Sequence, residues 1–260
     1  MRNKIVKEVS RFVFRYQESD KISTSWGDPV VGFASAADPL FEELKNVVVS
    51  THTLPRDLLP DAQTVISFFL PFSKSIAATN IRGKMSSPEW ATCYVETNEL
   101  IKQLGYHLHE VLEKAGEKLV AIPATHNWIE DKLVSNWSHR HVAFIAGLGR
   151  FGLNNMLITE KGCSGRIGSL ITTGAIPADK RPEIEACLYK YEKSCKKCVQ
   201  KCVNEALFKD SFDRFKCYAQ LLENVEEYKN VGYADVCGKC LVAVPCTHND
   251  PVKLKLKAKN

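Results

Sequence analysis

The chain has 260 residues, 45% hydrophobic and 25% charged, a composition typical of globular proteins that excludes a disordered or fibrous chain. No apolar run approaches the roughly 20 residues that span a bilayer, and residues 1–7 are charged, unlike a signal peptide. We therefore expect no membrane span and a cytoplasmic location. The net charge of +5 comes mainly from a basic tail, residues 251–260, which we expect to be a frayed end or an edge strand.

Hydrophobic periodicity predicts a mixture of helices and strands. In chain order we expect a helix over 2–17, a strand over 30–33, a short helix over 40–45, a strand over 64–70, a long helix over 88–114, a strand over 118–122, a helix over 131–146, and strands over 156–159 and 167–173. The segment 64–70 (TVISFFL) is β-branched and aromatic, as buried strands are, and Gly116 suits the end of the long helix. The fold class that this order indicates is α+β.

A boundary between two domains is expected at residues 177–182 (PADKRP), where prolines and charges interrupt the pattern. We assign residues 1–180 to an α+β domain and residues 181–250 to a cysteine-rich domain, followed by the basic tail. The second domain has few apolar residues of its own, so something other than a hydrophobic core must hold it together.

Ten cysteines are present, and eight of them lie in one 60-residue stretch: Cys187, Cys195, Cys198, Cys202, Cys217, Cys237, Cys240 and Cys246. In a cytosolic chain such clustering favours metal ligation over disulfides. A C-x2-C turn directs two thiolates at one metal centre, and eight ligands make two sites. Cys93 and Cys163 stand apart and are expected to be small buried hydrophobic residues.

The C-x2-C-x3-C run at 195–202 and the single Cys217 favour two [4Fe-4S] clusters over two zinc sites or disulfides, which remain as alternatives. In two-cluster ferredoxin modules the last cysteine of each run ligates the other cluster. Applying this crossover gives two sets of ligands. The first set is Cys187, Cys195, Cys198 and Cys246, and the second set is Cys202, Cys217, Cys237 and Cys240.

Gly147, Gly149 and Gly152 match the G-x-G-x-x-G fingerprint of dinucleotide-binding proteins. That motif requires a strand before it and a helix after it. Here a helical pattern precedes the glycines and a strand pattern follows them, so we reject a dinucleotide site. The glycines still indicate close approach of the backbone to another chain segment or to a ligand.

The stretch 138–173 (SHRHVAFIAGLGRFGLNNMLITEKGCSGRIGSLITT), followed by the cysteine pattern, resembles the epoxyqueuosine reductase and reductive dehalogenase superfamily, and more closely its short double-cluster iron–sulfur members. The resemblance covers roughly residues 30–250. It implies a nitroreductase-like domain that holds a base-off cobalamin against a ferredoxin-like domain with two [4Fe-4S] clusters.

The resemblance also implies roles for residues near the glycine-rich turn 146–155, which would lie along the corrinoid. The cofactor-binding candidates are Ser138, Arg140, Gly147, Gly149, Gly152 and Asn154. Epoxyqueuosine reductases carry an acidic proton donor about fourteen residues before the first glycine, where this chain has Leu133. His139 and His141 are candidate replacements, since histidine titrates near neutrality, although the residue type alone favours a structural role for either one.

The leading hypothesis is an oxidoreductase that reduces a small or corrinoid-bound substrate, with a ferredoxin or flavodoxin as electron donor. A second hypothesis is an electron-transfer partner that serves another protein's corrinoid and catalyses nothing itself. A third is a zinc-stabilised module whose basic tail contacts nucleic acid. The superfamily's tRNA-binding helical extension and export signal have no match in this sequence, so we expect neither a nucleic-acid partner nor a membrane span.

Overall fold

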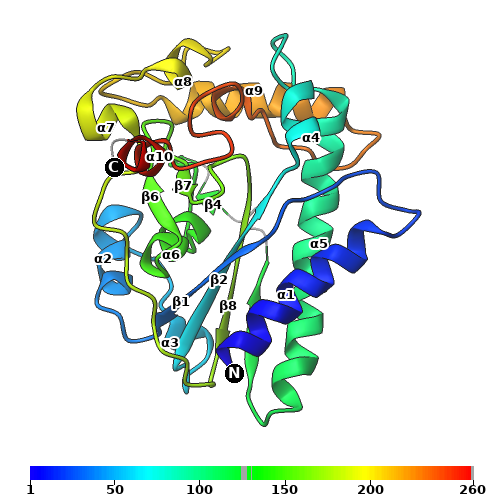
Figure 1. Ribbon diagram of the computed structural model, residues 1–260, viewed down its shortest axis with the longest axis vertical. Helices are drawn as coiled ribbons and strands as arrows, with labels where there is room; N and C mark the ends of the chain where they lie inside the picture. Colours follow the sequence, from blue (N-terminus) through cyan, green and yellow to red (C-terminus); the bar gives the residue numbers. More distant parts are fainter. Residues whose placement is uncertain (124–127, 130, 259–260) are drawn as a thin grey trace.

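The computed structural model describes residues 1–123, 128–129 and 131–258. Its centre is an antiparallel sheet of four strands in the order β1-β2-β8-β3 (Figure 1). These strands are β1 (Val30–Ser35), β2 (Thr64–Pro71), β3 (Leu119–Ile122) and β8 (Gly165–Thr172). β2 pairs with β8 along its whole length, from Thr64 opposite Thr172 to Pro71 opposite Gly165. The four strands predicted in these regions are confirmed, and so is the mixed composition of helices and strands.

Helices cover both faces of the sheet, which explains why every residue of β2 is buried. The covering helices are α1 (Arg2–Gln17) and α5 (Pro88–Glu113) on one face, and α2 (Leu40–Val47) and α6 (His139–Ile145) on the other (Figure 1). Successive side chains of a strand point to opposite faces. Accordingly, Ile66 and Phe68 pack on the side of α1 and α5, and Val65 and Phe69 pack on the side of α2 and α6.

The long helix predicted over 88–114 is confirmed as α5. It begins where the Ser87 hydroxyl accepts a hydrogen bond from the Trp90 backbone N–H at 3.1 Å, with Pro88 in the first turn. Just past its end, Gly116 adopts a φ of 80°, a left-handed conformation that glycine takes freely. Even this helix is too polar for a bilayer, and no described helix has the length and apolar character that a membrane span requires.

The helix predicted over 131–146 is wrong in its first half. Residues 131–133 form a turn, and β5 (Val134–Ser135) pairs with β4 (Trp128–Ile129), so that α6 begins only at His139. Leu133 has a φ of 47°, which a right-handed helix does not accommodate. The apolar spacing that suggested a helix here comes from a hairpin.

A second hairpin lies in the glycine-rich segment, where β6 (Gly149–Phe151) pairs with β7 (Leu157–Thr159). The order is therefore helix, glycine turn and strand, which confirms the rejection of a dinucleotide fingerprint. Two short helices complete this part of the chain, α3 (Pro55–Leu58) and α4 (Lys74–Thr79).

The cysteine-rich segment covers one end of the sheet and is drawn in yellow to red at the top of Figure 1. Its elements are α7 (Leu188–Glu192), α8 (Lys197–Gln200), α9 (Arg214–Glu227), the 3-10 helix η1 (Lys239–Leu241) and α10 (Pro251–Lys257). The basic tail is thus a helix through Lys257, and the prediction of a frayed end or an edge strand is wrong. Asp250 caps this helix by accepting the Lys253 N–H at 2.9 Å, and Val252 is buried beneath it.

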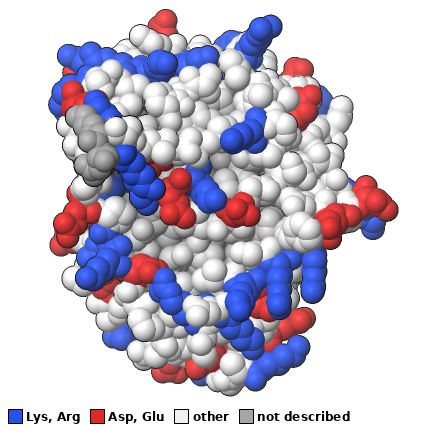
Figure 2. All heavy atoms as spheres, viewed as in Figure 1, with Lys and Arg blue, Asp and Glu red and all other residues white. Residues whose placement is uncertain are grey.

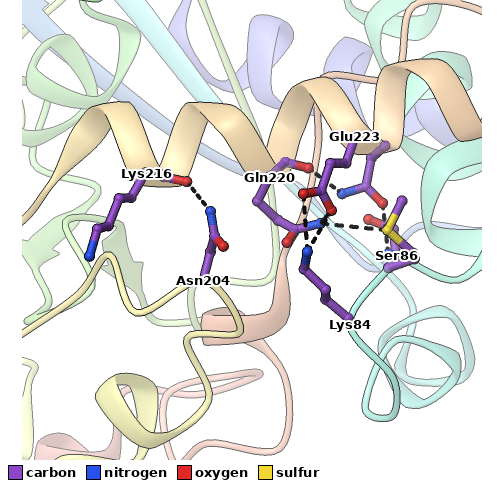
Figure 3. Close-up of polar contacts among 8 residues, drawn as sticks. Lys84, Ser86, Asn204, Lys216, Gln220 and Glu223 are labelled. Atoms are coloured by element: carbon purple, nitrogen blue, oxygen red, sulfur yellow. Dashed lines mark hydrogen bonds and ion pairs between the residues drawn. The ribbon is translucent and has the colours of Figure 1, made fainter.

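Polar contacts attach α9 to the loop before α5 (Figure 3). The Asn224 Oδ1 accepts the backbone N–H of Ser86 at 2.8 Å, and the Lys84 ammonium pairs with the Glu223 carboxylate at 2.8 Å. Gln220 and Asn224 are the buried residues of this helix, and both are polar. The helix is therefore held by hydrogen bonds and an ion pair where other helices of the fold use apolar packing.

Candidate functional site

The eight clustered cysteines form two groups in space. The first group lines a small cavity of about 20 Å³ and consists of Cys187, Cys195, Cys198 and Cys246. The second group lies on the wall of a large cavity of about 930 Å³ and consists of Cys202, Cys217, Cys237 and Cys240. These are the same two sets that the crossover interpretation assigns, and their binding of clusters stays a prediction.

Burial and the neighbouring thiols oppose the ionisation of Cys198 in the first group and of Cys217 in the second. Burial raises the pKa of Cys198 to about 12, and the other three cysteines of the first group add to the shift. Burial likewise raises the pKa of Cys217 to about 11, with contributions from two cysteines of the second group. Because the thiolate is the form that binds metal, such thiols ionise readily only around a positive centre. No three His, Cys, Asp or Glu side chains of the described residues converge tightly enough for a single metal ion.

The C-x2-C turn of the second group packs against α5 and the loop before it. Gly238 has a φ of 71°, and a Cβ there would lie 2.3 Å from the Trp90 ring, so only glycine fits. Lys239 is 2% exposed, and its Nζ donates to the carbonyl oxygens of Asn80 at 3.1 Å and Arg82 at 2.6 Å. Burial lowers the pKa of this ammonium, whereas Cys237 at the start of the turn favours its charged form. The turn thus places a buried positive group beside the second cysteine group.

Asn154 joins the two groups. Its Nδ2 donates to the Cys240 carbonyl oxygen at 3.3 Å and lies 3.8 Å from the Cys163 sulfur. The Cys163 sulfur in turn lies 3.8 Å from the sulfur of Cys246 in the first group. Cys93 and Cys163 are both buried, as predicted, but Cys163 also contacts a candidate ligand.

The residues predicted beside the ligand at the start of α6 all lie on the wall of the large cavity: Ser138, His139, Arg140 and His141. The His141 Nδ1 lies 2.7 Å from the Ser138 Oγ, and its ring lies 4.8 Å from that of Phe151, centre to centre. Burial, followed by the charge of Arg140, lowers the pKa of His141 to about 4. His141 is therefore a neutral imidazole at neutral pH.

His139 is held at both ring nitrogens. Its Nε2 lies 3.0 Å from the Pro123 carbonyl oxygen, and its Nδ1 lies 2.8 Å from the Ser169 Oγ. A carbonyl oxygen only accepts, so Nε2 carries the proton and Nδ1 accepts the Ser169 hydroxyl, which itself accepts the Trp137 indole N–H at 3.0 Å. Burial lowers the pKa of His139 to about 4. Nε2 donates the single proton of this ring to a backbone carbonyl oxygen, and a role of His139 as a catalytic acid stays a prediction.

The three glycines of the turn face the chain itself and not the large cavity. A Cβ on Gly147 would lie 2.9 Å from the Lys180 carbonyl oxygen, and one on Gly149 would lie 2.1 Å from the Ile158 carbonyl oxygen. A Cβ on Gly152 would meet a neighbouring side chain at 2.6 Å. None of these three glycines is among the described residues that line the large cavity. The small size of these glycines lets chain segments pack together, and their close approach to a corrinoid stays a prediction.

Several wall residues were not predicted from the sequence. Within the described part of the chain, the buried Nε1 of Trp90, Nε of Arg166 and Oε1 of Gln220 have no hydrogen-bond partner. The Tyr94 hydroxyl donates to Asp235 at 2.5 Å on the same wall. A buried polar atom without a partner costs free energy, so three of them on one cavity wall are typical of a site that a ligand completes. These residues come from α5, β8, α9 and the segment before η1, and no local sequence signal connects them.

A pH-dependent stability is expected from His139 and His141. Their folded pKa values of about 4 lie below the ordinary 6.5, so the unfolded chain binds more protons between these two values. The stability that the two neutral rings contribute is therefore fully present above about pH 6.5 and is lost as the pH falls toward 4. We expect the thermal midpoint of His141→Gln to fall less than that of the wild type between pH 7 and pH 5 in calorimetry. An equal decrease of the thermal midpoint in the variant and the wild type would contradict the buried, neutral state of His141.

No protein-family model matches the chain, and no curated protein matches its sequence. Solved structures do match, and they define the class of fold: the chain shares the fold of epoxyqueuosine reductases and reductive dehalogenases. The resemblance to this superfamily that the sequence indicated is confirmed at the level of the fold.

Three solved structures are representative. A crystal structure of epoxyqueuosine reductase matches 93% of this chain and 66% of its own, with a TM-score of 0.57 and 18% identity. The Bacillus subtilis epoxyqueuosine reductase, solved with its catalytic loop swung out of the active site, has the same coverage and identity and a TM-score of 0.52. A catabolic reductive dehalogenase in complex with 3-bromo-4-hydroxybenzoic acid matches 88% of this chain and 31% of its own, with a TM-score of 0.57 and 17% identity. The chain thus spans slightly less than two thirds of the reductases and about a third of the dehalogenase.

Proposed function

We propose that this chain is an iron–sulfur oxidoreductase that holds two [4Fe-4S] clusters and reduces a corrinoid or another small substrate in the large cavity. The observation that carries the proposal is the position of the second cysteine group on the wall of that cavity, in a fold shared with two kinds of reductase. A redox centre that borders a ligand cavity can exchange electrons with the molecule inside it. A nitroreductase-like domain over 1–180 and a ferredoxin-like domain over 181–250 belong to the same proposal.

The donor set of each cysteine group fits a [4Fe-4S] cluster, which takes four thiolate ligands. Each group supplies four thiols, and burial, followed by the neighbouring thiols, raises the pKa of Cys198 to about 12 and that of Cys217 to about 11. The buried Lys239 ammonium adds positive charge beside the second group. When bound, the clusters would supply one-electron redox capacity at both positions.

The large cavity fits a bulky organic ligand. Its volume of about 930 Å³ lies near the upper end of ligand pockets, which measure roughly 300–1,000 Å³. Trp90 and Trp137 supply aromatic surface on its wall, and Arg140 and Arg166 supply positive charge. A corrinoid, when bound, would supply a metal centre that reacts with the substrate.

The proton donor must differ from that of the epoxyqueuosine reductases that the sequence resembles. Leu133 lies on the cavity wall where those proteins carry an acid, and the nearby Asp131 is exposed. The Tyr94 hydroxyl does hold a proton on the wall, since burial raises its pKa to about 12. Asp235 accepts the hydrogen bond of this hydroxyl and fixes its direction. We therefore place the substrate in a different class from epoxyqueuosine, and we expect a small molecule and no nucleic acid.

The test begins with metal analysis of protein purified without oxygen. Two clusters predict about eight irons per chain. About two zinc ions and no iron would overturn the proposal and favour a zinc-stabilised module. Titration of the iron-loaded protein with cob(II)alamin is then expected to change the corrinoid spectrum and to saturate near one equivalent. An unchanged spectrum would remove the corrinoid from the proposal and favour an electron-transfer partner that serves another protein's corrinoid.

A further inference from the structure

Lysines are concentrated in two segments beside the first cysteine group. Residues 188–201 contain five lysines and one glutamate, and α10 adds three lysines and no acid. This local excess is larger than the chain's whole net charge of +5, so the remaining residues together are slightly acidic. The two segments are therefore strongly basic, as is α1, which has five basic residues and one glutamate.

These segments lie side by side on the surface. The Lys255 ammonium pairs with the Glu192 carboxylate at 2.5 Å, which connects α10 to α7 and neutralises the one acid of residues 188–201. Figure 2 shows basic atoms along the upper left margin, over α7 and α8 and beside the end of α10. The lysines of α7, α8, α10 and the turn between α7 and α8 form what we call the lysine face.

The lysine face surrounds the first cysteine group. Cys195 lies between α7 and α8 and is half-buried, and Pro251 at the start of α10 lines the small cavity of this group. Lys193 and Lys196 are exposed, and their Nζ atoms lie 4.9 and 5.8 Å from the centre of the Tyr189 ring. The ring attracts both ammonium groups, so it favours conformations that keep the two charges together.

We propose that the lysine face docks an acidic one-electron carrier protein, which reduces the centre held by the first cysteine group. This inference rests on the proposed function and assigns its electron-entry surface. A single electron leaves the carrier's own redox centre and enters the first-group centre, with no bond formed or broken. The second group, on the large cavity, then lies on the substrate side, and Asn154 and Cys163 lie between the two groups.

Electrostatic steering makes this proposal measurable, because oppositely charged proteins associate faster and lose that advantage as salt screens their charges. The probe is a pre-reduced acidic [2Fe-2S] ferredoxin, mixed in stopped flow with the oxidised, iron-loaded protein. The test variant is Lys193→Gln/Lys197→Gln. The matched control is Lys4→Gln/Lys7→Gln, which removes two charges from exposed lysines of α1.

At low ionic strength the test variant is expected to lower the second-order rate constant about 3- to 10-fold and to flatten its salt dependence, whereas the α1 control keeps the wild-type rate. The amount of cluster reduced by excess dithionite should be equal in all three proteins. Equal rates in both double variants, or a rate independent of salt, would overturn the docking proposal. So would a loss of single-stranded RNA binding in the test variant with its ferredoxin rate unchanged. Protein without dithionite-reducible iron would instead show that the proposed function itself fails.

Discussion

Alanine at Cys202 is expected to remove the same cluster as alanine at Cys237, although Cys202 follows Cys198 by only four residues. Each single variant should retain about four of about eight irons, because one cubane is lost and the other stays intact. The double variant Cys202→Ala/Cys237→Ala should also retain about four. The combination Cys195→Ala/Cys237→Ala should retain almost none, because it affects both groups.

The reason is the placement of the thiols. Cys202 and Cys237 lie on the large cavity, and Cys195 lies on the small one. Both Cys202 and Cys237 raise the pKa of Cys217, the second-group thiol that stands alone in the sequence. Iron content and electron paramagnetic resonance of anaerobic protein measure the outcome.

Cys93→Ala is the matched control, since this buried cysteine of α5 belongs to neither group and should leave all the iron in place. The assignment would be reversed if the double variant Cys195→Ala/Cys202→Ala lost no more iron than either single variant. That result would place Cys195 and Cys202 on the same cluster. Loss of all iron in every single variant would show that the two centres do not form independently.

The grouping of the cysteines is the part of the site that could be predicted from the sequence. Spacing within a C-x2-C turn is local, and the crossover between runs follows from how short runs wrap around a cluster. Helices and strands with a strong apolar period were also predictable, such as α1, β2 and α5, because each has an apolar face that must be buried.

The wall of the large cavity could not be predicted in this way. α9 contributes Cys217 and Gln220 to that wall, yet its buried residues are polar, and a search for hydrophobic periodicity therefore misses it. Arg166 and Tyr94 lie on β8 and α5, where each appears in the sequence as an ordinary member of its element. Only the folded chain stacks them, with the guanidinium carbon 4.1 Å from the centre of the Tyr94 ring.

Two incorrect elements have different causes. In residues 131–135 pairing with β4 in a local hairpin overrides a helical pattern. For α10 the signal was present, because an aspartate followed by a proline, here Asp250 and Pro251, is typical of a helix start. The alternation of leucine and lysine was taken as a sign of a strand, but Val252 is the residue of this helix that is buried.

Gly149→Ala is expected to destabilise the whole protein by about 3 kcal/mol, the upper end of the usual cost of overpacking, because the contact is with backbone. Gly149 pairs with Thr159 across the β6–β7 hairpin, and its Cβ would lie 2.1 Å from the Ile158 carbonyl oxygen, where no rotation of a side chain relieves the clash. The hairpin must open or shift. Gly83→Ala is the matched control, since a Cβ there meets nothing within 4 Å, and its φ of 75° costs only about 1–2 kcal/mol.

The damage at Gly149 should also reach the first cysteine group. The hairpin is followed by Cys163, whose backbone N–H donates to the Cys246 carbonyl oxygen at 2.9 Å, and by Ser164, whose N–H donates to Thr247 at 3.1 Å. A shifted β7 therefore displaces the strand start that positions Cys246. Urea unfolding of both variants should show a much lower midpoint for Gly149→Ala, and brief exposure to a chelator should remove iron from it faster than from Gly83→Ala. A glycine that served only to admit a corrinoid would behave differently, because the alanine variant would keep the wild-type midpoint and iron content and lose cob(II)alamin binding alone.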